Sequence, residues 1–340
     1  MTRNPIDGFQ VDPRSVRHVG RDLQRPECIL AERDGTLWSA DARGGVMRIG
    51  ADGSQSLIAQ IQDDSFAAAK DETERFTPTT TLPNGLAFDR NGSFLISNFG
   101  TDRLERMSRD GSRTEVLLDR IDGHPIGKVN FVLRDRRGRI WITVSTRTRN
   151  WMSAISPNVA DGYVAVLDER GARIVADGFA FTNEIRFDAE ERWLYVVETS
   201  GRRITRLRIS EDAEVEAREI FGPSDTGGFI DGIAFDAYGN LWGTHVMSDR
   251  IFVLTPEGDM RVILEDHDPE ASAALYAAFE RDQATPELML AAGGTLAPWF
   301  ASVTFGGPGL QRVYIGSLRG TTIPWFDTPV AGLPMVHWDE

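Results

Sequence analysis

The chain has 340 residues, of which 41% are hydrophobic, and it contains 33 glycines and 16 prolines. This composition is typical of a globular protein with many short turns, and no apolar run of about 18 residues indicates a membrane-spanning helix. The formal net charge of −14 argues against nucleic acid as a partner, because phosphate binding requires a basic surface.

The N-terminal residues and the cysteine content indicate a compartment. The opening residues MTRNPIDGFQVDPRS contain no apolar segment of the kind found in a secretory signal. Cys28 is the only cysteine, which excludes disulfides and cysteine-based zinc sites within one chain. We therefore expect a cytoplasmic protein that neither binds nucleic acid nor enters a membrane.

Six copies of one pattern recur along the chain. Each begins with a polar residue and an alternating apolar strand, has a turn residue eight positions on, and opens a second apolar strand eleven positions on. In chain order the copies are ECILAERDGTLWSAD from Glu27, NGLAFDRNGSFLISN from Asn84, NFVLRDRRGRIWITV from Asn130, NEIRFDAEERWLYVV from Asn183, DGIAFDAYGNLWGTH from Asp231 and SVTFGGPGLQRVYIG from Ser302. Each copy predicts a β-hairpin with a tight turn.

The spacing of the copies predicts the fold. They begin 57, 46, 53, 48 and 71 residues apart, which leaves room for two further strands after each hairpin. Six units of four short antiparallel strands predict an all-β chain, a six-bladed β-propeller, forming a single domain over residues 1–340. A TIM barrel would need long helices between strands, and only 269–283 is a good helix candidate. Two β-sandwich domains would give no reason for six similar units.

The ring is expected to close through the N-terminus. Residues 15–23, SVRHVGRDL, resemble the outer strands of other units, which also precede a first strand. This N-terminal strand would complete the sixth blade and remove an exposed sheet edge. The short helical insertion near 269–283 lies within 265–300, the longest insertion of the repeat. With 61–80 and 146–160, this insertion is expected to border one mouth, as a lid over substrate or as an oligomer contact.

The polar residues that begin the six copies are expected to meet at that mouth, because the first strand of each propeller blade lines the central channel. They are Glu27, Asn84, Asn130, Asn183, Asp231 and Ser302. Two carboxylates and three carboxamides in one place would repel or remain poorly hydrogen-bonded without a cation. Hard oxygen donors without thiolate or imidazole favour Ca²⁺ over zinc, and other divalent cations would also fit.

At these positions the chain resembles the senescence marker protein / gluconolactonase / luciferin-regenerating enzyme family of calcium-dependent propeller lactonases. The resemblance extends over roughly residues 20–330 and is carried by RPEC, LPNGLAFDRNGSFLISNFG, FTNEIRFD and IDGIAFDAYGNLW in the first, second, fourth and fifth copies. It implies that Glu27, Asn183 and Asp231 bind the metal, with Asn130 as a further ligand or as a contact to substrate or water.

Two positions depart from the family pattern. Sugar-lactonase relatives often carry Arg two residues before the third-copy Asn and Asp after it, whereas this chain has Lys128 and Phe131 in the stretch GKVNF. The departures argue against gluconolactone itself as the substrate and leave a less polar or bulkier lactone open.

The resemblance also implies the chemistry. A bound cation would polarise a lactone carbonyl and stabilise the oxyanion formed when water attacks. The family assigns the base to the counterpart of Asp231. The competing base is His245, fourteen positions on, where the returning strand comes back to the same mouth; a purely structural or substrate-contacting His245 is the third reading.

Further polar residues are candidates for contact with a small-molecule substrate. Asn84, Asn130 and Lys128 belong to the expected ring or lie beside it. Asn98 occupies the same offset as His245, as does Asp41, and for Asn98 an ordinary turn role is as well supported as substrate contact. Cys28 is expected to point away from the channel and to behave as a small buried hydrophobe.

Three functions from different classes follow from this pattern. The first is a metal-dependent hydrolase that opens a lactone. The second uses the same metal site on a phosphotriester or an aryl ester. The third is a calcium-stabilised propeller that binds a ligand without catalysis, which would require a cation fully enclosed by protein. The sequence assigns no oligomeric state.

Overall fold

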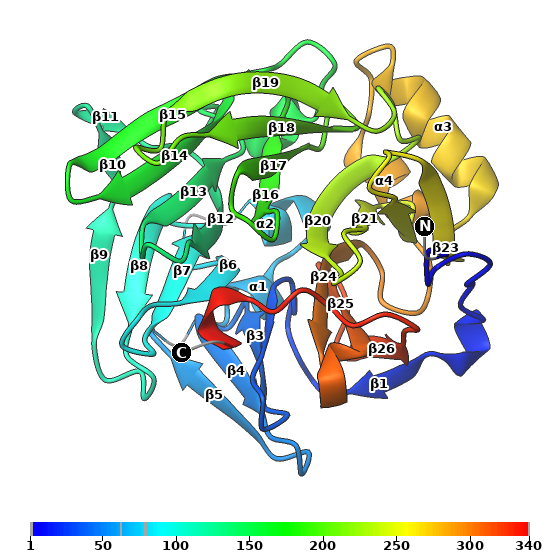
Figure 1. The fold of residues 1–340 in the computed structure, drawn as a ribbon, viewed down its shortest axis with the longest axis horizontal. Coiled ribbons are helices and arrows are strands. Elements are labelled where there is room, and N and C mark those ends of the chain that lie inside the picture. Colours follow the sequence, from blue (N-terminus) through cyan, green and yellow to red (C-terminus); the bar gives the residue numbers. More distant parts are fainter. Residues whose placement is uncertain (1–2, 62, 78–79, 339–340) are drawn as a thin grey trace.

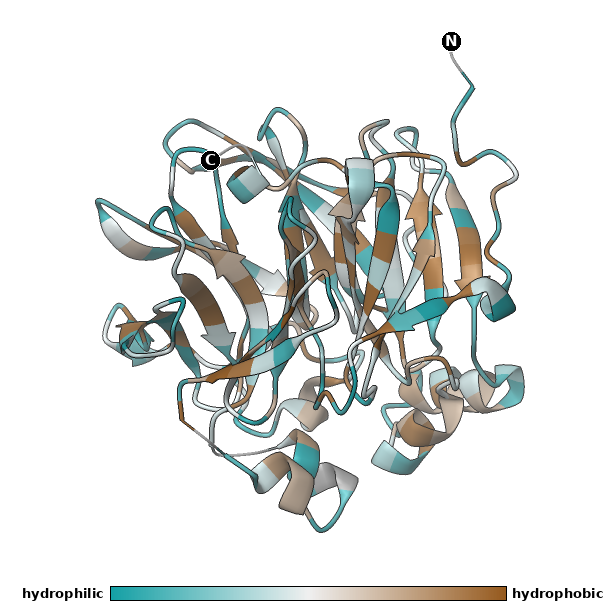
Figure 2. Ribbon diagram, turned by 90° about the horizontal axis from the view of Figure 1, so that it is seen from below, coloured by the Kyte–Doolittle hydropathy of each residue, from teal (hydrophilic) through white to brown (hydrophobic). Residues whose placement is uncertain are grey.

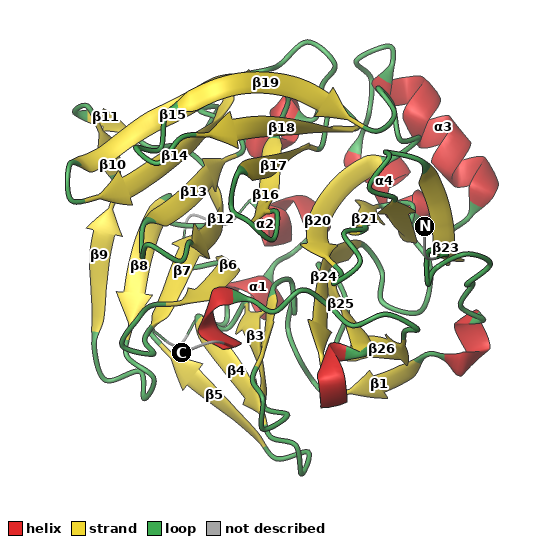
Figure 3. Ribbon diagram, viewed as in Figure 1, coloured by secondary structure: helices red, strands yellow, loops and turns green. Residues whose placement is uncertain are grey.

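The computed structural model describes residues 3–61, 63–77 and 80–338. Six four-stranded antiparallel sheets stand around a central axis as the blades of a propeller (Figure 1). The predicted all-β, six-bladed fold is therefore confirmed. Figure 3 shows how little of the chain is helical.

Each of the first three blades follows the chain from the axis outward. The first contains β2 (Ile29–Ala31), β3 (Leu37–Asp41), β4 (Gly45–Ile49) and β5 (Gln55–Ala59). The second contains β6 (Pro83–Phe88), β7 (Phe94–Asn98), β8 (Arg103–Met107) and β9 (Thr114–Leu118). The third contains β12 (Val129–Arg134), β13 (Ile140–Val144), β14 (Gly162–Asp168) and β15 (Gly171–Phe179). A small ribbon of β10 (Arg120–Ile121) and β11 (His124–Pro125) precedes the third blade.

The remaining blades include the one that closes the ring. The fourth contains β16 (Thr182–Phe187), β17 (Trp193–Glu198), β18 (Arg203–Ile209) and β19 (Val215–Phe221), and the fifth contains β20 (Phe229–Phe235), β21 (Leu241–Val246), β22 (Arg250–Leu254) and β23 (Met260–Glu265). The sixth contains β24 (Phe300–Gly306), β25 (Arg312–Ser317), β26 (Ile323–Asp327) and, as its outer strand, β1 (Arg17–Val19). Arg17 pairs with Trp325 and Val19 with Ile323, which confirms closure by the N-terminal strand.

The turn predicted eight positions into each copy has the same backbone conformation in all six. The residues with positive φ there are Gly35, Gly92, Gly138, Glu191, Gly239 and Leu310. Glycine adopts this conformation without strain, which explains its use in four copies. Glu191 and Leu310 adopt it with φ of 53° and 58°. The turn therefore keeps a positive φ in the two copies that lack glycine at this position.

A buried hydrogen bond fastens several of these hairpins to the core. The indole Nε1 of Trp141 donates to Asp135 Oδ2 at 2.8 Å, and that of Trp242 donates to Asp236 Oδ2 at 2.9 Å. Each aspartate begins the turn and each tryptophan lies six residues later, on the returning strand. A buried indole N–H usually requires a partner, so this contact fixes strand register and satisfies the ring together.

The two faces of the propeller differ (Figure 2). The helices α1 (Ser65–Ala68), α2 (Glu72–Phe76), α3 (Pro269–Phe279) and α4 (Pro286–Ala292) gather on one face, and both chain ends lie on the other. The single helix expected over 269–283 ends at Phe279, and α4 follows it within the same insertion. The short helices in 61–80 and α4 were missed because runs of four to seven residues carry little periodicity.

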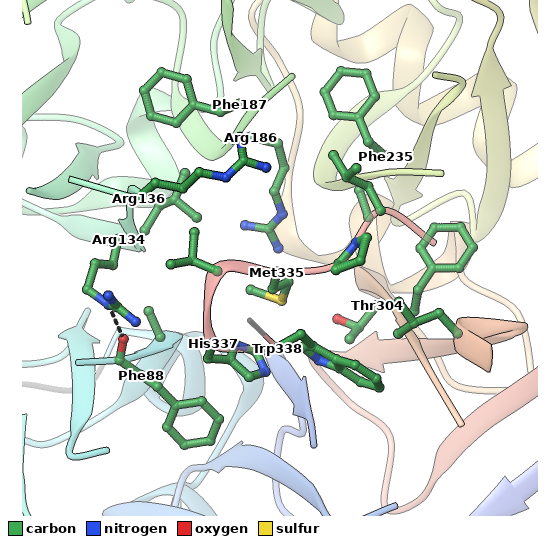
Figure 4. Close-up of a pocket in the computed structure, with 18 of the residues that line it drawn as sticks. Phe88, Arg134, Arg136, Arg186, Phe187, Phe235, Thr304, Met335, His337 and Trp338 are labelled. Carbon is green, nitrogen blue, oxygen red and sulfur yellow. Dashed lines mark hydrogen bonds between the residues drawn. The ribbon is translucent and has the colours of Figure 1, made fainter. Parts of the chain in front are cut away.

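Residues 333–338 cross the axis at the face opposite the helices (Figure 4). They cover a cavity of about 90 Å³ whose walls include Phe88, Phe187 and Phe235. Arg134 lies at its edge and donates from Nε to the carbonyl oxygen of Phe88 at 2.9 Å. In the described ranges, none of the helices has the length and apolar character needed to cross a membrane.

The Asp–Trp contact predicts a measurable difference between two turn aspartates. Asp236 is buried and accepts from the indole of Trp242 and from the backbone and side-chain amides of Asn240. We expect Asp236→Ala to lower the free energy of unfolding by about 3 kcal/mol, because several buried donors lose a charged acceptor. Asp110→Ala, in an exposed turn, is the control. Equal urea midpoints for the two variants would contradict this role.

Candidate active site

The first strands of the blades bring five of the six predicted ring residues to one cavity on the face that carries the helices, whereas Ser302 lies outside its lining. Asn84 lies on β6, Asn130 on β12, Asn183 on β16 and Asp231 on β20, and Glu27 precedes β2. All five line one cavity of about 50 Å³. The structure therefore brings together residues that are separated by more than 200 positions in the chain.

Local breaks in strand pairing aim these side chains. The register between first and second strands shifts between Pro83 and Leu86, Val129 and Phe131, Thr182 and Ile185, and Ile230 and Ile233. Each interval contains the ring residue of its blade. A β-bulge redirects side chains and is common beside active sites. The polar side chains thus leave the ordinary alternation of the strand and reach the cavity.

Carboxamides connect the ring, and two acceptors are left over. Asn84 Nδ2 donates to Glu27 Oε1 at 3.2 Å and to the carbonyl oxygen of Asn130 at 2.9 Å. Asn183 Nδ2 donates to Thr199 Oγ1 at 3.1 Å. The other Glu27 oxygen, Oε2, and the Asn183 oxygen Oδ1 are buried without a hydrogen-bond donor among the described residues. Buried acceptors of this kind are costly unless a donor or cation approaches them.

The two acids at the cavity are difficult to ionise together. Burial raises the pKa of Glu27 to about 8, with a further increase from Glu184 that Arg25 and Arg186 oppose. Burial also raises the pKa of Asp231 well above its usual range, and the neighbouring Glu27 and Glu184 add to this. Two such carboxyl groups must retain protons or share a cation.

Arg25 is a site residue that the sequence reasoning missed. Its guanidinium is buried, donates from Nη2 to Asn84 Oδ1 at 2.5 Å and from Nη1 to the carbonyl oxygen of Pro83 at 3.2 Å, and lies close enough to Glu27 and Asp231 to interact with their charges. The sequence signal was its place two residues before Glu27 in RPEC. It supplies one fixed positive charge against two carboxylates.

The donor set fits a hard divalent cation. Glu27, Asp231 and the Asn183 and Asn130 carboxamides offer only oxygen, which is the ligand type of Ca²⁺ and Mg²⁺. Within the described part of the chain, no three His, Cys, Asp or Glu side chains group as a metal site. The cavity lining instead combines carboxyl and carboxamide oxygens, whereas zinc favours nitrogen and sulfur.

Apolar residues from several loops and strand ends line the cavity above the ring. They are Phe76, Leu82, Phe99, Trp151, Ile155, Phe181, Val246, Met247 and Leu318. Trp151, in the 3₁₀ helix Trp151–Ala154, donates from Nε1 to the carbonyl oxygen of Phe76 at 2.6 Å. The Phe76 ring lies 5.1 Å from that of Trp299. The loops expected to border the mouth, 61–80, 146–160 and 265–300, thus meet through these three residues.

A larger cleft of about 710 Å³ lies beside the closed cavity. Phe76, Phe99 and Trp151 line both spaces and therefore separate them. Lys128 lines the cleft and not the cavity. Its Nζ lies 2.9 Å from Asp102 Oδ1 and donates to the carbonyl oxygen of Phe99 at 3.3 Å.

His245 does not line the cavity. Its ring stacks on Phe252 at 4.6 Å, its Nε2 lies 3.1 Å from Thr226 Oγ1, and it is fully buried. The expectation that the returning strand carries its side chain to the mouth is not met, because β21 presents alternate residues to opposite sides. His245 lies on one face of the fifth blade, where it stacks on Phe252 of β22. Thr244 lies on the other face, where its hydroxyl group donates to the carbonyl oxygen of Ala301 in β24.

The other residues at the same offset also lie outside the lining. Asn98 accepts from the Leu82 amide at 2.9 Å and donates to Glu105 at 3.0 Å, which is a loop-fastening role. Asp41 pairs with Arg43 at 2.7 Å. Cys28 is a buried free thiol beside Leu86 and is absent from the cavity lining, as expected.

Three comparisons place these features among known proteins. The chain is 25% identical over 212 residues to 6-deoxy-6-sulfogluconolactonase of Pseudomonas putida, and the aligned region covers 60% of each chain, which is less than two thirds of that relative's length. A gluconolactonase from Xanthomonas campestris has a similar structure, with a TM-score of 0.63 and 20% identity, covering 97% of this chain and 94% of that one. Regucalcin from Agrobacterium tumefaciens, described as a calcium-binding protein, has a TM-score of 0.62 and 16% identity, covering 94% and 96%.

The structural likenesses are below 25% identity and concern the fold. A family profile carries the assignment, because it matches residues 67–266, more than half of the chain, and includes the ring residues of four blades. The chain belongs to the family described as the SMP-30/gluconolactonase/LRE-like region.

Proposed function

We propose that this protein is a metal-dependent hydrolase that opens a lactone. The observation that carries the proposal is the pair of buried carboxyl groups, Glu27 and Asp231, in one cavity with the donorless oxygen of Asn183. Family membership supports it, as do the names of the two lactonase relatives. The calcium-binding neighbour supports Ca²⁺ as the ion.

Glu27, Asn183 and Asp231 would hold the cation, with Asn130 as a further oxygen donor. When bound, Ca²⁺ supplies Lewis-acid polarisation of a carbonyl group. The apolar walls lower the local dielectric constant, which strengthens the electrostatic interactions of the charges beside them. The guanidinium of Arg25 holds Asn84 in place and keeps a positive charge beside the reacting centre.

Asp231 is the proposed base. It takes a proton from water as the water oxygen bonds to the lactone carbonyl carbon. The ring C–O bond then breaks, and the departing alcohol oxygen receives the proton back from Asp231. A cation held beside Asp231 would favour the ionised form of its carboxyl group, which is the form that accepts this proton.

His245 is the weaker choice. It lies outside the cavity, and burial, with Arg250 and His267 nearby, lowers its pKa to about 3. Its ring is therefore neutral and a poor proton acceptor at neutral pH. A packing role in the fifth blade accounts for its contacts.

The apolar walls also bear on the alternatives. An aryl ester, or a phosphotriester with an aryl group, would place its aromatic ring against Phe99, Trp151 and Phe181, so these esters are to be added to the lactone screen. A ligand-binding propeller without catalysis would bind calcium but open no lactone. The cytoplasm is the proposed location, because the single cysteine is a free thiol.

The base assignment predicts loss of turnover in one variant. We expect Asp231→Asn to lower kcat by at least about 100-fold, because proton transfer loses its acceptor. Cys28→Ala, beside the ring but outside the cavity, is the matched control and should retain its kinetics. A pH-indicator screen over sugar, aliphatic and aromatic lactones, with and without chelator, measures both. Full activity after complete chelation would exclude the metal-dependent mechanism.

Calcium binding should displace a proton. Because the pKa of Glu27 is about 8, that carboxyl group is largely protonated at pH 7 and must ionise to bind the cation. We expect calcium affinity to rise from pH 6 to pH 9, as measured by titration calorimetry in buffers of different ionisation enthalpy. Glu27→Gln should lose binding, whereas Glu191→Gln, at the opposite mouth, should retain it. A calcium affinity that does not change with pH would contradict a protonated Glu27 in the metal-free protein.

His245 predicts an effect on acid stability rather than on turnover. Its folded-state pKa lies below that of the unfolded chain, so the unfolded state binds more protons as the pH falls below about 6.5. The free energy of unfolding should therefore decline by up to about 1.4 kcal/mol per pH unit from about pH 6.5 toward pH 3.

The variant His245→Gln should remove this part of the slope in urea unfolding at successive pH values. His18→Gln, at an exposed position of β1, serves as the control. A collapse of lactone turnover in folded His245→Gln, with an altered pH–rate profile, would instead restore the histidine as the base.

A further inference from the structure

We propose that the cleft beside the closed cavity binds an anionic group carried by the lactone. A carboxylate, sulfonate or phosphate ester would occupy the cleft while the lactone carbonyl reaches the ring of oxygen donors. This inference rests on the proposed hydrolase function and adds the chemical class of the substrate.

The cavity at the ring is small for a substrate. Its volume is about 50 Å³, well below the range of about 300–1,000 Å³ found for small-molecule sites. A lactone ring with its exocyclic oxygen is several times larger than water. A substrate whose carbonyl group reaches the ring would therefore need space beyond this cavity.

A substrate that extends beyond the cavity can reach the cleft through the wall that the two spaces share. Phe76, Phe99 and Trp151 line both spaces, so their displacement would join the cavity to the cleft. The cleft, at about 710 Å³, lies within the range of about 300–1,000 Å³ found for small-molecule sites. A bound substrate would then span the two compartments.

The charged residues of the cleft favour a substrate with a negatively charged substituent. Its lining contains three cations, Arg103, Lys128 and Arg149, against one acid, Asp102, although the whole chain carries a net charge of −14. Lys128 is only 7% exposed, and its Nζ lies 2.9 Å from Asp102 Oδ1. After that pair is counted, the two arginines remain as the net charge of the lining, and Arg149 lies near enough to Asp102 to oppose the rise that burial causes in the pKa of that carboxyl group.

Both arginines are available for a ligand. Arg103 and Arg149 are exposed, and among the described residues neither side chain forms an ion pair or a hydrogen bond to the protein. Guanidinium groups bind carboxylate, sulfonate and phosphate oxygens in bidentate fashion. Two of them beside a buried lysine form a site for a multi-oxygen anion.

The arginines at the opposite mouth do not offer the same opportunity. Arg186 pairs with Glu184 at 3.1 Å, and Arg136 donates to the carbonyl oxygen of Ala189 at 2.7 Å. Arg134 bonds to Phe88, and residues 333–338 lie across the opening (Figure 4). Those guanidinium groups already have partners within the protein. We therefore place the anion site in the cleft on the face that carries the helices.

The test compares two lactones that differ only in a terminal group, a sulfonate in one and a hydroxyl in the other. We expect the wild-type protein to prefer the sulfonated lactone in kcat/KM by at least about tenfold at low salt, with the preference falling as ionic strength rises. In Arg103→Gln/Arg149→Gln the preference should shrink about tenfold through KM. Arg113→Gln, an exposed arginine on the β8–β9 turn, should retain the wild-type ratio.

A second measurement separates this inference from the proposed function. Calorimetric titration with the ring-opened sulfonated hydroxy acid reports anion binding without turnover, and the double arginine variant should weaken it. Equal turnover of both lactones, or a ratio unchanged in the double variant, would overturn the anion site and leave the hydrolase standing. If no lactone is opened, the proposed function fails, and the titration alone decides whether the cleft binds the anion.

Discussion

Two carboxyl groups buried together at the axis set the requirement that the rest of the site must meet. Glu27 and Asp231 share a small cavity, and burial raises the pKa of both. Neither can ionise easily beside the other unless positive charge is present. Arg25 provides one fixed charge, and a divalent cation would provide the remainder while using the donorless oxygens of Glu27 and Asn183.

Closure of the propeller brings those groups together. The outer strand β1 pairs with β26, so the blade that begins the chain's repeat and the blade that ends it are neighbours. Interruptions of strand pairing at the ring residues then turn polar side chains toward the axis. The fold thus brings the first strands of the blades together, and the bulges orient the polar side chains of those strands toward the cavity.

Much of the fold and the ring could be predicted because the repeat can be recognised in the amino-acid sequence. The two offsets within each copy predicted the hairpins, the positions of their turns and the convergence of Glu27, Asn183 and Asp231. The side chains at the next offset could not be placed in this way. His245 and Asn98 share an offset with one another, but His245 packs within the fifth blade and Asn98 bonds to a loop, because alternate residues of a strand point to opposite sides.

The aromatic wall and Arg25 required three-dimensional information for a different reason. Phe76, Trp151 and Trp299 come from three loops of unrelated sequence, and only their contacts show that Phe76 and Trp151 line the cavity with Trp299 packed behind Phe76. The basic cleft likewise combines Lys128 with Arg103 of one strand and Arg149 of a loop. Such clusters have no repeat that would reveal them.

The most direct test of the central claim is a crystal structure of the protein grown with Ca²⁺, with the ion located by its anomalous scattering. The account predicts one ion on the propeller axis, with oxygens of Glu27, Asn183 and Asp231 at about 2.3–2.6 Å. An ion bound elsewhere, or a cavity in which the guanidinium of Arg25 alone bridges the two carboxylates at saturating calcium, would contradict it.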